Sequence, residues 1–208
     1  MKKNKVDKNW QYAHANDYYV KKSKIDGYRS RAAYKLIEID DKFSFFNNAK
    51  NAVDLGAFPG GWSQVINNKY EHIDLFAVDL KELIDIPRVN FIKCNLISDY
   101  EDNFIILKNF LPTNLDIVLS DMAPNTNGNK TSDHLLSMEL CEIALEVVSA
   151  FLNEGGKFAC KIFIGGEESD FVIKMKKIFK KVCFFKPKSS KNSSREIYLI
   201  GLDKINII

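Results

Sequence analysis

Apolar residues occur along the chain in two patterns: short continuous runs, and longer stretches in which they recur every three or four positions. Short runs bounded by turn residues are typical of strands. They predict seven strands, over residues 51–56, 73–79, 89–93, 115–121, 157–163, 182–185 and 196–202. Spacings of three and four predict helices that begin near Ser30, Gly61 and Ser169, and a long helix over 133–152 that Gly155 and Gly156 end.

Strands that alternate with helices predict a parallel sheet covered by helices on both faces. The last two strands differ, because only the Ser-, Lys- and Asn-rich residues 186–194 join them. A parallel pair needs a crossover of a dozen or more residues, so the last strand is expected to be antiparallel. The expected fold is therefore α/β and Rossmann-like, with a mostly parallel seven-stranded sheet. Since the 208 residues contain no internal repeat or linker, residues 1–208 are expected to form one domain.

The net charge is only +3, but lysines and arginines gather in two parts of the chain, residues 1–31 and 174–195. If these two basic groups meet on one face, they form a footprint for a polyanion. A solvated lysine-rich surface explains them equally well. Residues 1–28 are expected to form a basic arm whose rings, such as Trp10, Tyr18 and Tyr19, suit either stacking on unpaired bases or packing as a helix.

Other features of the composition exclude several classes of protein. The four cysteines lie far apart and the three histidines have no metal-like companions, so neither a metal site nor a disulfide framework is expected. This favours a reducing intracellular compartment, with cytoplasm, nucleolus and mitochondrion all open. No apolar run approaches the ~18–20 residues of a membrane span, and no secretory signal is recognisable, so no membrane association is expected.

The most informative stretch is DLGAFPGGW, residues 54–62, at the end of the first predicted strand. Gly56 lets the backbone turn sharply there and approach a ligand closely. The spacing is not the GxGxxG of a dinucleotide site and no P-loop lysine follows, so a pyrophosphate is not the expected ligand. Asp79 ends the second strand, where an acidic side chain can hold a ribose diol. A nucleoside without pyrophosphate fits S-adenosylmethionine, whereas a bare tight turn with a capping aspartate leaves the Pro-Gly-Gly-Trp run unexplained.

Five motifs make the sequence resemble the FtsJ (RrmJ) family of ribose 2′-O-methyltransferases, over nearly the whole chain from Trp10 onward. They are YRSRAAYKL (28–36), VDLGAFPGGWSQ (53–64), SDMAPN (120–125), GGKFACK (155–161) and SSREIY (193–198). The resemblance implies the Rossmann-like class I methyltransferase fold. It also implies an enzyme that transfers a methyl group from S-adenosylmethionine to a ribose 2′-hydroxyl of RNA.

The resemblance further implies which residues form the site. The family's catalytic tetrad maps to Lys35, Asp121, Lys161 and Glu196. The cofactor-binding residues that we expect from the motif and the glycine turn are Gly56, Pro59, Gly60, Gly61, Trp62, Asp79 and Asp121. Where the family commonly has an aspartate that accepts from the adenine amino group, this chain has Asn95, whose carbonyl can still accept that bond without a charge.

Lys161 lies in an apolar strand, where desolvation would lower the pKa of its amine toward that of a useful base. Lys35 would lower this pKa further and Asp121 and Glu196 would oppose the shift, so the sequence leaves the balance open. We expect Lys161 to be the base or the activator of the ribose hydroxyl, oriented by Asp121. Lys35 and Glu196 are expected to position the ribose.

Contacts with RNA are expected from Tyr28, Arg29, Arg31, Lys186, Lys188 and Arg195. The compact length favours large-subunit ribosomal RNA as the substrate, free or within an assembled subunit, and a monomeric enzyme. Transfer RNA anticodon loops and messenger RNA caps are the alternatives among RNA enzymes. A non-catalytic RNA-binding module would be expected to lack part of the tetrad, and a small-molecule methyltransferase to carry a lid over its pocket.

Overall fold

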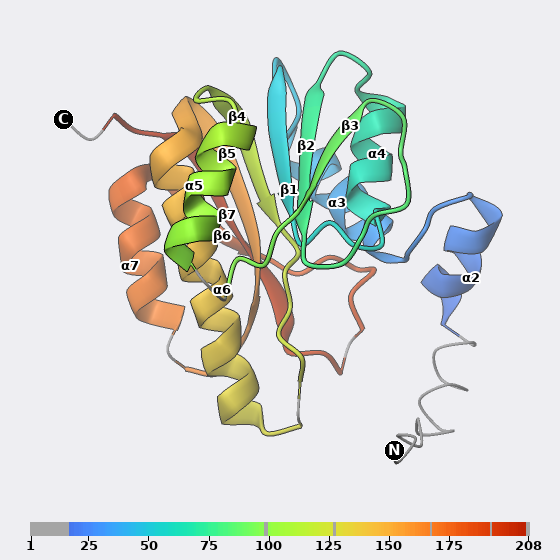
Figure 1. Cartoon of the computed structure of the whole chain (residues 1–208). Helices are drawn as coiled ribbons and strands as arrows, with labels where there is room; N and C mark the ends of the chain where they lie inside the picture. Colours follow the sequence, from blue (N-terminus) through green and yellow to red (C-terminus); the bar gives the residue numbers. More distant parts are fainter. Residues whose placement is uncertain (1–16, 98–99, 127, 167, 192, 207–208) are drawn as a thin grey trace, which may run out of the picture.

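The computed structural model describes residues 17–97, 100–126, 128–166, 168–191 and 193–206 (Figure 1). Its helices are α2 (Tyr18–Ile25), α3 (Ala32–Phe43), α4 (Gly61–Lys69), α5 (Tyr100–Phe110), α6 (Lys130–Phe151) and α7 (Glu168–Ile178). Its strands are β1 (Asn51–Leu55), β2 (Asp74–Asp79), β3 (Val89–Lys93), β4 (Leu115–Ser120), β5 (Leu152–Phe163), β6 (Phe179–Phe185) and β7 (Glu196–Lys204). None of the described helices is both long and apolar enough to cross a membrane.

The strands form one seven-stranded sheet in the order β3-β2-β1-β4-β5-β7-β6. The neighbours from β3 to β5 pair in parallel, and β7 pairs antiparallel with both β5 and β6. This confirms the predicted Rossmann-like sheet and its reversed last strand. The chain leaves β1 toward β2 on one side and returns at β4 on the other. The carboxyl ends of β1 and β4 therefore flank the topological switch point, where such sheets bind ligands.

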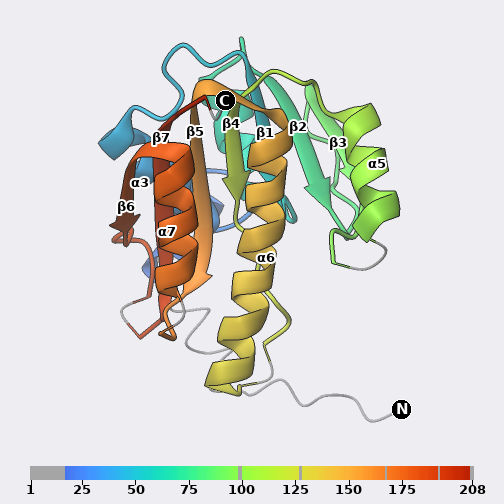
Figure 2. The same cartoon turned by 90° about the vertical axis from the view of Figure 1, so that its left-hand side faces the viewer.

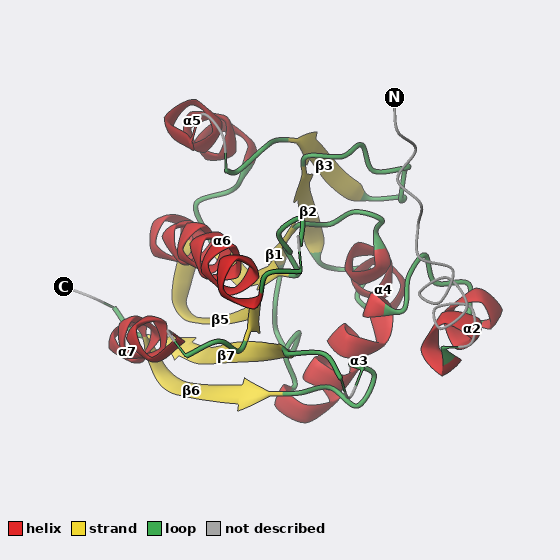
Figure 3. Ribbon diagram, turned by 90° about the horizontal axis from the view of Figure 1, so that it is seen from below, coloured by secondary structure: helices red, strands yellow, loops and turns green. Residues whose placement is uncertain are grey.

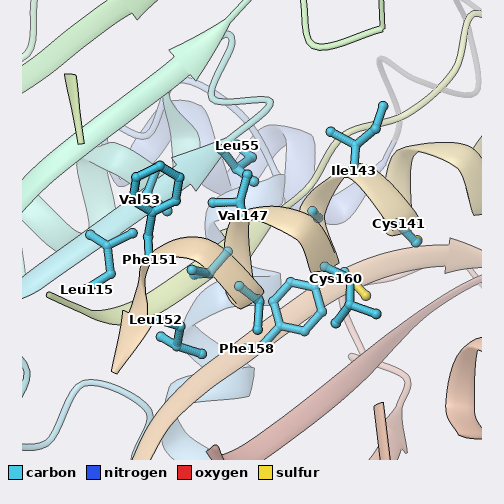
Figure 4. Packing of buried hydrophobic residues seen from close by; sticks show 14 of the residues in the cluster. Val53, Leu55, Leu115, Cys141, Ile143, Val147, Phe151, Leu152, Phe158 and Cys160 are labelled. Atoms are coloured by element: carbon cyan, nitrogen blue, oxygen red, sulfur yellow. The ribbon is translucent and has the colours of Figure 1, made fainter. Parts of the chain in front are cut away.

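Helices cover both faces of the sheet, α5, α6 and α7 on one side and α3 and α4 on the other (Figures 2 and 3). Because side chains alternate along a strand, one strand supplies both cores. In β5, Phe158 and Cys160 enter the cluster under α6 and α7, where they pack against residues such as Val147 and Phe151 (Figure 4). Ala159 faces the opposite cluster, formed with α3 and α4. This alternation directs the side chain of Lys161 toward the α3 side of the sheet.

The end of the long helix differs from the prediction. Residues 155–156 do not end the long helix, because α6 already ends at Phe151 and β5 begins at the next residue. Leu152, which has an extended backbone, caps α6 by donating its backbone N–H to the carbonyl of Val148. Both Phe151 and Leu152 are buried, so the helix passes into the strand inside the core. Gly155, with φ of 75°, then accommodates the register shift by which β5 pairs with β4.

Two helices add to the predicted set. Tyr18 and Tyr19 lie in α2, where Asp17 caps the helix by accepting from the backbone N–H of Tyr19 and Val20. The segment is therefore helical, but Tyr18 is exposed and Tyr19 partly exposed, so the helix leaves stacking on bases open to both rings. Trp10, Lys2 and the rest of the basic arm before residue 17 lie outside the described residues. Helix α5 was not predicted, although Leu107 in the helix and Leu111 directly after it are buried in the core.

We expect Phe158→Ala to lower the free energy of unfolding by about 3–5 kcal/mol, because Phe158 is fully buried and stacks on Phe179, with ring centroids 6.1 Å apart. Urea denaturation followed by circular dichroism measures the change. Ile173→Ala, on the exposed surface of α7, is the matched control and should cost less than ~0.5 kcal/mol. Similar losses in both variants would contradict this assignment of the core.

Candidate active site

The four residues of the predicted tetrad form two ion pairs beside the carboxyl end of β4. Nζ of Lys161, in β5, lies 2.9 Å from Oδ1 of Asp121 and donates to the Asp121 carbonyl at 2.5 Å. Nζ of Lys35, in α3, lies 2.5 Å from Oε1 of Glu196, the first residue of β7. Both lysines are buried, with 7–8% of their surface exposed. Buried charges are tolerated when they are paired and hydrogen-bonded, and each lysine here has its own carboxylate.

Tyr198 connects the two pairs, and the sequence analysis assigned it no role. It is fully buried in β7, opposite Lys161 in the antiparallel register, and its hydroxyl donates to Oδ1 of Asp121 at 2.7 Å. The ammonium of Lys35 lies 5.9 Å from the centre of its ring. Its position two residues after Glu196 is the signal that could have identified it, because residues i and i+2 of a strand face the same side.

The pairing also sets the protonation of these groups. Burial alone would raise the pKa of Asp121. The positive charges of Lys161 and Lys35 and the hydrogen bonds from Lys161 and Tyr198 outweigh that effect, so this pKa lies below its ordinary value. Burial and the negative charges of Asp121 and Glu196 raise the pKa of the Tyr198 phenol well above its usual range. At neutral pH, Asp121 is therefore a carboxylate and Tyr198 a neutral hydrogen-bond donor.

A hollow of about 180 Å³ opens beside the second ion pair, lined by Arg31, Lys35, Lys191, Ser194 and Glu196. Glu196 is held in place from two directions. Its Oε1 accepts from the hydroxyl of Ser190 at 3.0 Å, and its backbone N–H donates to Ser194 Oγ at 3.1 Å. A substrate group that enters this tetrad hollow meets an oriented ammonium and an oriented carboxylate.

The glycine turn after β1 needs glycine for steric reasons. Gly56 has φ of 78°, and a Cβ on it would lie 2.9 Å from the backbone of Met122, the residue after Asp121. Gly60 has φ of 106°, and a Cβ there would lie 3.1 Å from the Arg29 side chain. Pro59 is exposed between them and Gly61 begins α4. The turn thus packs directly against the segment that carries Asp121.

Asp79 fixes this turn from the neighbouring strand. Its Oδ2 accepts from the backbone N–H of Phe58 at 2.9 Å and its Oδ1 from that of Lys81 at 2.7 Å. An ionised carboxylate has about four acceptor positions, so about two remain for a ligand. Asn95 is exposed after β3, and its Oδ1 accepts from the backbone N–H of Ile97 at 3.1 Å.

Trp62 differs from the expected cofactor contact. Its indole is 2% exposed in the core between α3, α4 and the sheet, with its ring 5.6 Å from that of Tyr198. Its Nε1–H donates to the carbonyl of Ala32 at 2.8 Å. The side chain therefore fastens α4 to α3, because an amphipathic α4 buries its large apolar residue.

The structure brings only parts of the two basic groups together: the guanidinium of Arg31 contacts the carbonyl of Ser189 as well as Asp17, whereas Lys174, Lys176 and Lys177 lie in α7 on the other face of the sheet. The arginines themselves, however, are engaged within the protein. Arg29 donates to the carbonyls of Ile84 and Asp85 at 2.5 and 2.7 Å. Charge reversal at either arginine would therefore disturb these contacts as well as any RNA.

The side chains of the other residues expected to contact RNA differ in whether they are already bonded within the protein. Lys186 Nζ donates to the carbonyl of Ser194 at 2.7 Å, and Arg195 donates to two backbone carbonyls at 3.2 and 3.4 Å. The Tyr28 ring packs edge-on against Tyr34, with centroids 5.7 Å apart. The ammonium of Lys188, which is exposed, has no partner within the described part of the chain.

A further carboxyl, that of Asp54, lies fully buried at the end of β1. Its Oδ2 accepts from Ser63 Oγ at 2.6 Å, while its Oδ1 has no partner among the described residues. Burial raises its pKa to about 7, against the lowering effect of the Ser63 hydrogen bond and with a further rise from the charges of Asp121 and Asp79. Three carboxyls thus crowd the carboxyl edge of the sheet, and the most buried one binds a proton near neutral pH.

Comparison with known proteins identifies the family. The model of the FtsJ-like methyltransferase family matches residues 28–204. The chain belongs to the FtsJ-like methyltransferase family. It is 47% identical to a ribosomal RNA large subunit methyltransferase E from Wolbachia pipientis wMel, over 90% of this chain and 95% of that protein. It is 44% identical to the enzyme of the same name from Ehrlichia chaffeensis, over 93% of this chain and 91% of that one.

A solved structure is similar as well. The crystal structure of a ribosomal RNA methyltransferase from Plasmodium falciparum superposes with a TM-score of 0.75 at 34% sequence identity, covering 86% of this chain and all of that one. The two proteins therefore share the fold although only about a third of their aligned residues are identical. In the described residues, no group of three or more His, Cys, Asp or Glu side chains could hold a metal ion.

We expect Asp54→Asn to flatten the pH dependence of stability between about pH 4 and pH 7. In this window the folded protein holds a proton on Asp54 that the unfolded chain has lost, so stability falls as pH rises, by at most ~1.4 kcal/mol per pH unit. Asparagine remains neutral throughout and can still accept from Ser63. Urea unfolding at a series of pH values should show the free energy of unfolding of the variant increasing relative to that of the wild type as pH rises. Asp74→Asn, at the exposed start of β2, should leave the curve parallel to the wild type, and a parallel curve for Asp54→Asn would refute the raised pKa.

Proposed function

We propose that this FtsJ-like enzyme transfers a methyl group from S-adenosylmethionine to a ribose 2′-hydroxyl of large-subunit ribosomal RNA. The observation that carries the proposal is the geometry of the tetrad: two buried lysines, each within 3 Å of a carboxylate, with a hollow between α3 and the start of β7 beside the second pair. A non-catalytic module has no use for two buried ion pairs at this position. Ribosomal RNA is the substrate named in the relatives' descriptions, and tRNA and the mRNA cap are the alternatives that the experiments below distinguish.

The residues at the carboxyl edge of the sheet fit S-adenosylmethionine. When bound, this cofactor supplies a methyl group activated on a sulfonium. Asp79 has acceptor positions left for the two ribose hydroxyls, and Asn95 can accept from an adenine amino group. Gly56, Pro59, Gly60 and Gly61 form the turn that would face the cofactor, with Asp121 on its other side. The buried indole of Trp62 is not part of this proposed contact surface.

The chemistry of this chain's residues is to orient a hydroxyl and manage its proton. A ribose that enters the tetrad hollow is positioned by Lys35 and Glu196. Lys161 then contacts the 2′-hydroxyl: as the neutral amine it accepts the hydroxyl proton and becomes the ammonium that pairs with Asp121, and as the ammonium it stabilises the developing negative charge. Asp121 and Tyr198 hold Lys161 in place. All four tetrad residues come from one chain, so the tetrad needs no residue of a second copy, and the proposal includes a monomeric enzyme with one domain over residues 1–208.

Mapping 2′-O-methylation across ribosomal and transfer RNA after depletion of the protein tests the substrate. Loss of one methyl group from large-subunit ribosomal RNA is expected. Loss from a tRNA anticodon loop or a cap instead would assign the enzyme to one of the alternative substrates.

Cofactor binding is expected to depend on the turn and on Asp79. Calorimetry with S-adenosylmethionine should show binding that Asp79→Ala weakens strongly, because the acceptor for the ribose diol is lost. Gly60→Val should weaken it too, since valine at φ of 106° is strained and its Cβ meets Arg29. Asp74→Ala, at the other end of β2, is the matched control and should bind as the wild type does. Wild-type protein that binds no S-adenosylmethionine would refute the proposal.

Catalysis is expected to depend on Lys161. Removing a general base typically costs ~10²–10⁴-fold in rate, so Lys161→Ala should lose turnover while it retains cofactor binding. Lys161→Arg should be nearly as inactive, because a guanidinium keeps the charge but does not release its proton. Lys157→Ala is the control from the same strand, because Lys157 Nζ donates to the carbonyls of Ser44 and Phe45, away from the tetrad. Single-turnover methylation measures the rates, and an active Lys161→Arg would mean that positive charge alone is needed.

A further inference from the structure

Two hollows open along one seam of the molecule, between α3 and the connection from β6 to β7, which lie side by side in Figure 3. The smaller is the tetrad hollow. The larger, about 640 Å³, lies further along α3 and is called the outer groove here. Its volume falls within the ~300–1,000 Å³ that small-molecule sites occupy. No residue of the predicted cofactor site or tetrad lines it.

The floor of the outer groove is aromatic and apolar. The rings of Tyr19 from α2 and Phe185 from the end of β6 line it together with Ile37, and all three side chains are partly exposed. Both rings are held by other rings: Tyr19 lies 5.3 Å from Tyr34, and Phe185 meets Phe43 edge-on at 5.5 Å. Fixed, partly exposed rings are the surfaces on which unpaired bases stack, at low entropic cost.

The rim of the groove is mainly basic. Lys42 contributes from α3, and Lys186 and Lys188 contribute from the connection after β6. Of the two acidic lining residues, Glu38 accepts from the backbone N–H of Lys188 at 2.6 Å and is committed to holding that connection against α3. Asp41 is exposed and opposes the lysines, so the rim retains a modest positive charge suited to a phosphate.

The outer groove continues the tetrad hollow. Lys35 lines the first and Lys42 the second, two turns apart on α3, which corresponds to about 10 Å along the helix axis. Ser189 connects the two linings: Arg31, from the tetrad hollow, contacts its carbonyl, and Glu38, from the outer groove, accepts from its backbone N–H at 2.9 Å. A strand whose ribose occupies the tetrad hollow is thus brought to the edge of the groove.

We propose that the outer groove binds a neighbouring nucleotide of the same RNA strand, with its unpaired base against Tyr19 and Phe185 and its phosphate near Lys186 and Lys188. This inference rests on the proposed function and adds to it a requirement: the target ribose must lie in a single-stranded or unstacked segment. The groove would then contribute to substrate selection at a distance from the reacting hydroxyl.

The role of the Tyr19 ring is tested by methylation kinetics on large-subunit ribosomal RNA from cells depleted of this protein. Tyr19→Leu should raise the KM for RNA on the order of tenfold, the size of one lost base stack, with kcat and S-adenosylmethionine affinity unchanged. Tyr19→Phe keeps the ring and should restore the wild-type KM. A wild-type KM in Tyr19→Leu, or a defect of equal size in Tyr19→Phe, would overturn the proposal.

Lys188 provides a second test that leaves the packing intact, because its ammonium is exposed and has no partner in the described residues. Lys188→Glu should weaken RNA binding and lower the slope of log affinity against log salt by about 1. Lys176→Glu makes the same charge change on α7, across the sheet, and should alter neither. Equal effects of the two variants would mean that only net charge matters and would overturn the groove assignment.

Photo-cross-linking separates a failure of this inference from a failure of the proposed function. The same RNA, carrying 4-thiouridine, should cross-link to peptides containing Tyr19 or Phe185 through nucleotides adjacent to the methylated one. Methylation without any cross-link in the groove would overturn the inference and leave the function standing. Wild-type enzyme that methylates neither this RNA nor large ribosomal subunits from the depleted cells would overturn the function itself.

Discussion

The burial of two lysine ammonium groups at one edge of the sheet is the constraint on which the rest of the site depends. A charged amine taken out of water requires a carboxylate and further hydrogen bonds close by, because an unpaired buried charge costs several kcal/mol. Lys161 meets this requirement through Asp121, and Lys35 meets it through Glu196. These partners come from four different elements, so the pairs can form only when the whole fold is assembled.

The antiparallel direction of β7 is what makes the pairing possible. Because β7 runs against β5, its first residue lies opposite Phe163, and Glu196 and Tyr198 lie at the end of the sheet where β4 stops. A parallel strand would begin at the other end of the sheet and would bring neither residue to Asp121. The reversed strand and the switch point between β1 and β4 therefore place the tetrad next to the glycine turn, with Met122 packed against Gly56. Burial raises the pKa of Asp54 in this crowded edge, and the charges of Asp121 and Asp79 raise it further.

The sequence predicted those features that depend on local pattern, and the features it missed depend on tertiary packing. Strand runs, the short connection before β7 and the glycine turn are local, and the structure confirms the elements that they predict. Trp62 and Arg29 lie in motifs that suggest ligands, and nothing in those motifs shows that their side chains donate to the carbonyls of Ala32 and of residues 84–85. In α5, the exposed Ile105 and Ile106 obscure the helical period of the buried leucines. Tyr198 holds Asp121 only because β7 pairs with β5, which brings its hydroxyl to that carboxylate.

Arginines near the site bond within the protein while lysines stay exposed, and this difference explains why a modest net charge is compatible with binding RNA. The planar guanidinium is suited to bridging backbone oxygens, and both Arg29 and Arg31 make such bonds within the protein. A lysine ammonium is a flexible point charge, and Lys188 and Lys191 are exposed beside the two hollows. The arginines thus shape the walls while lysines remain for phosphates. Because lysines meet phosphates without fixed geometry, base stacking and the fit of one ribose beside the buried tetrad would have to supply the selectivity that the charges lack.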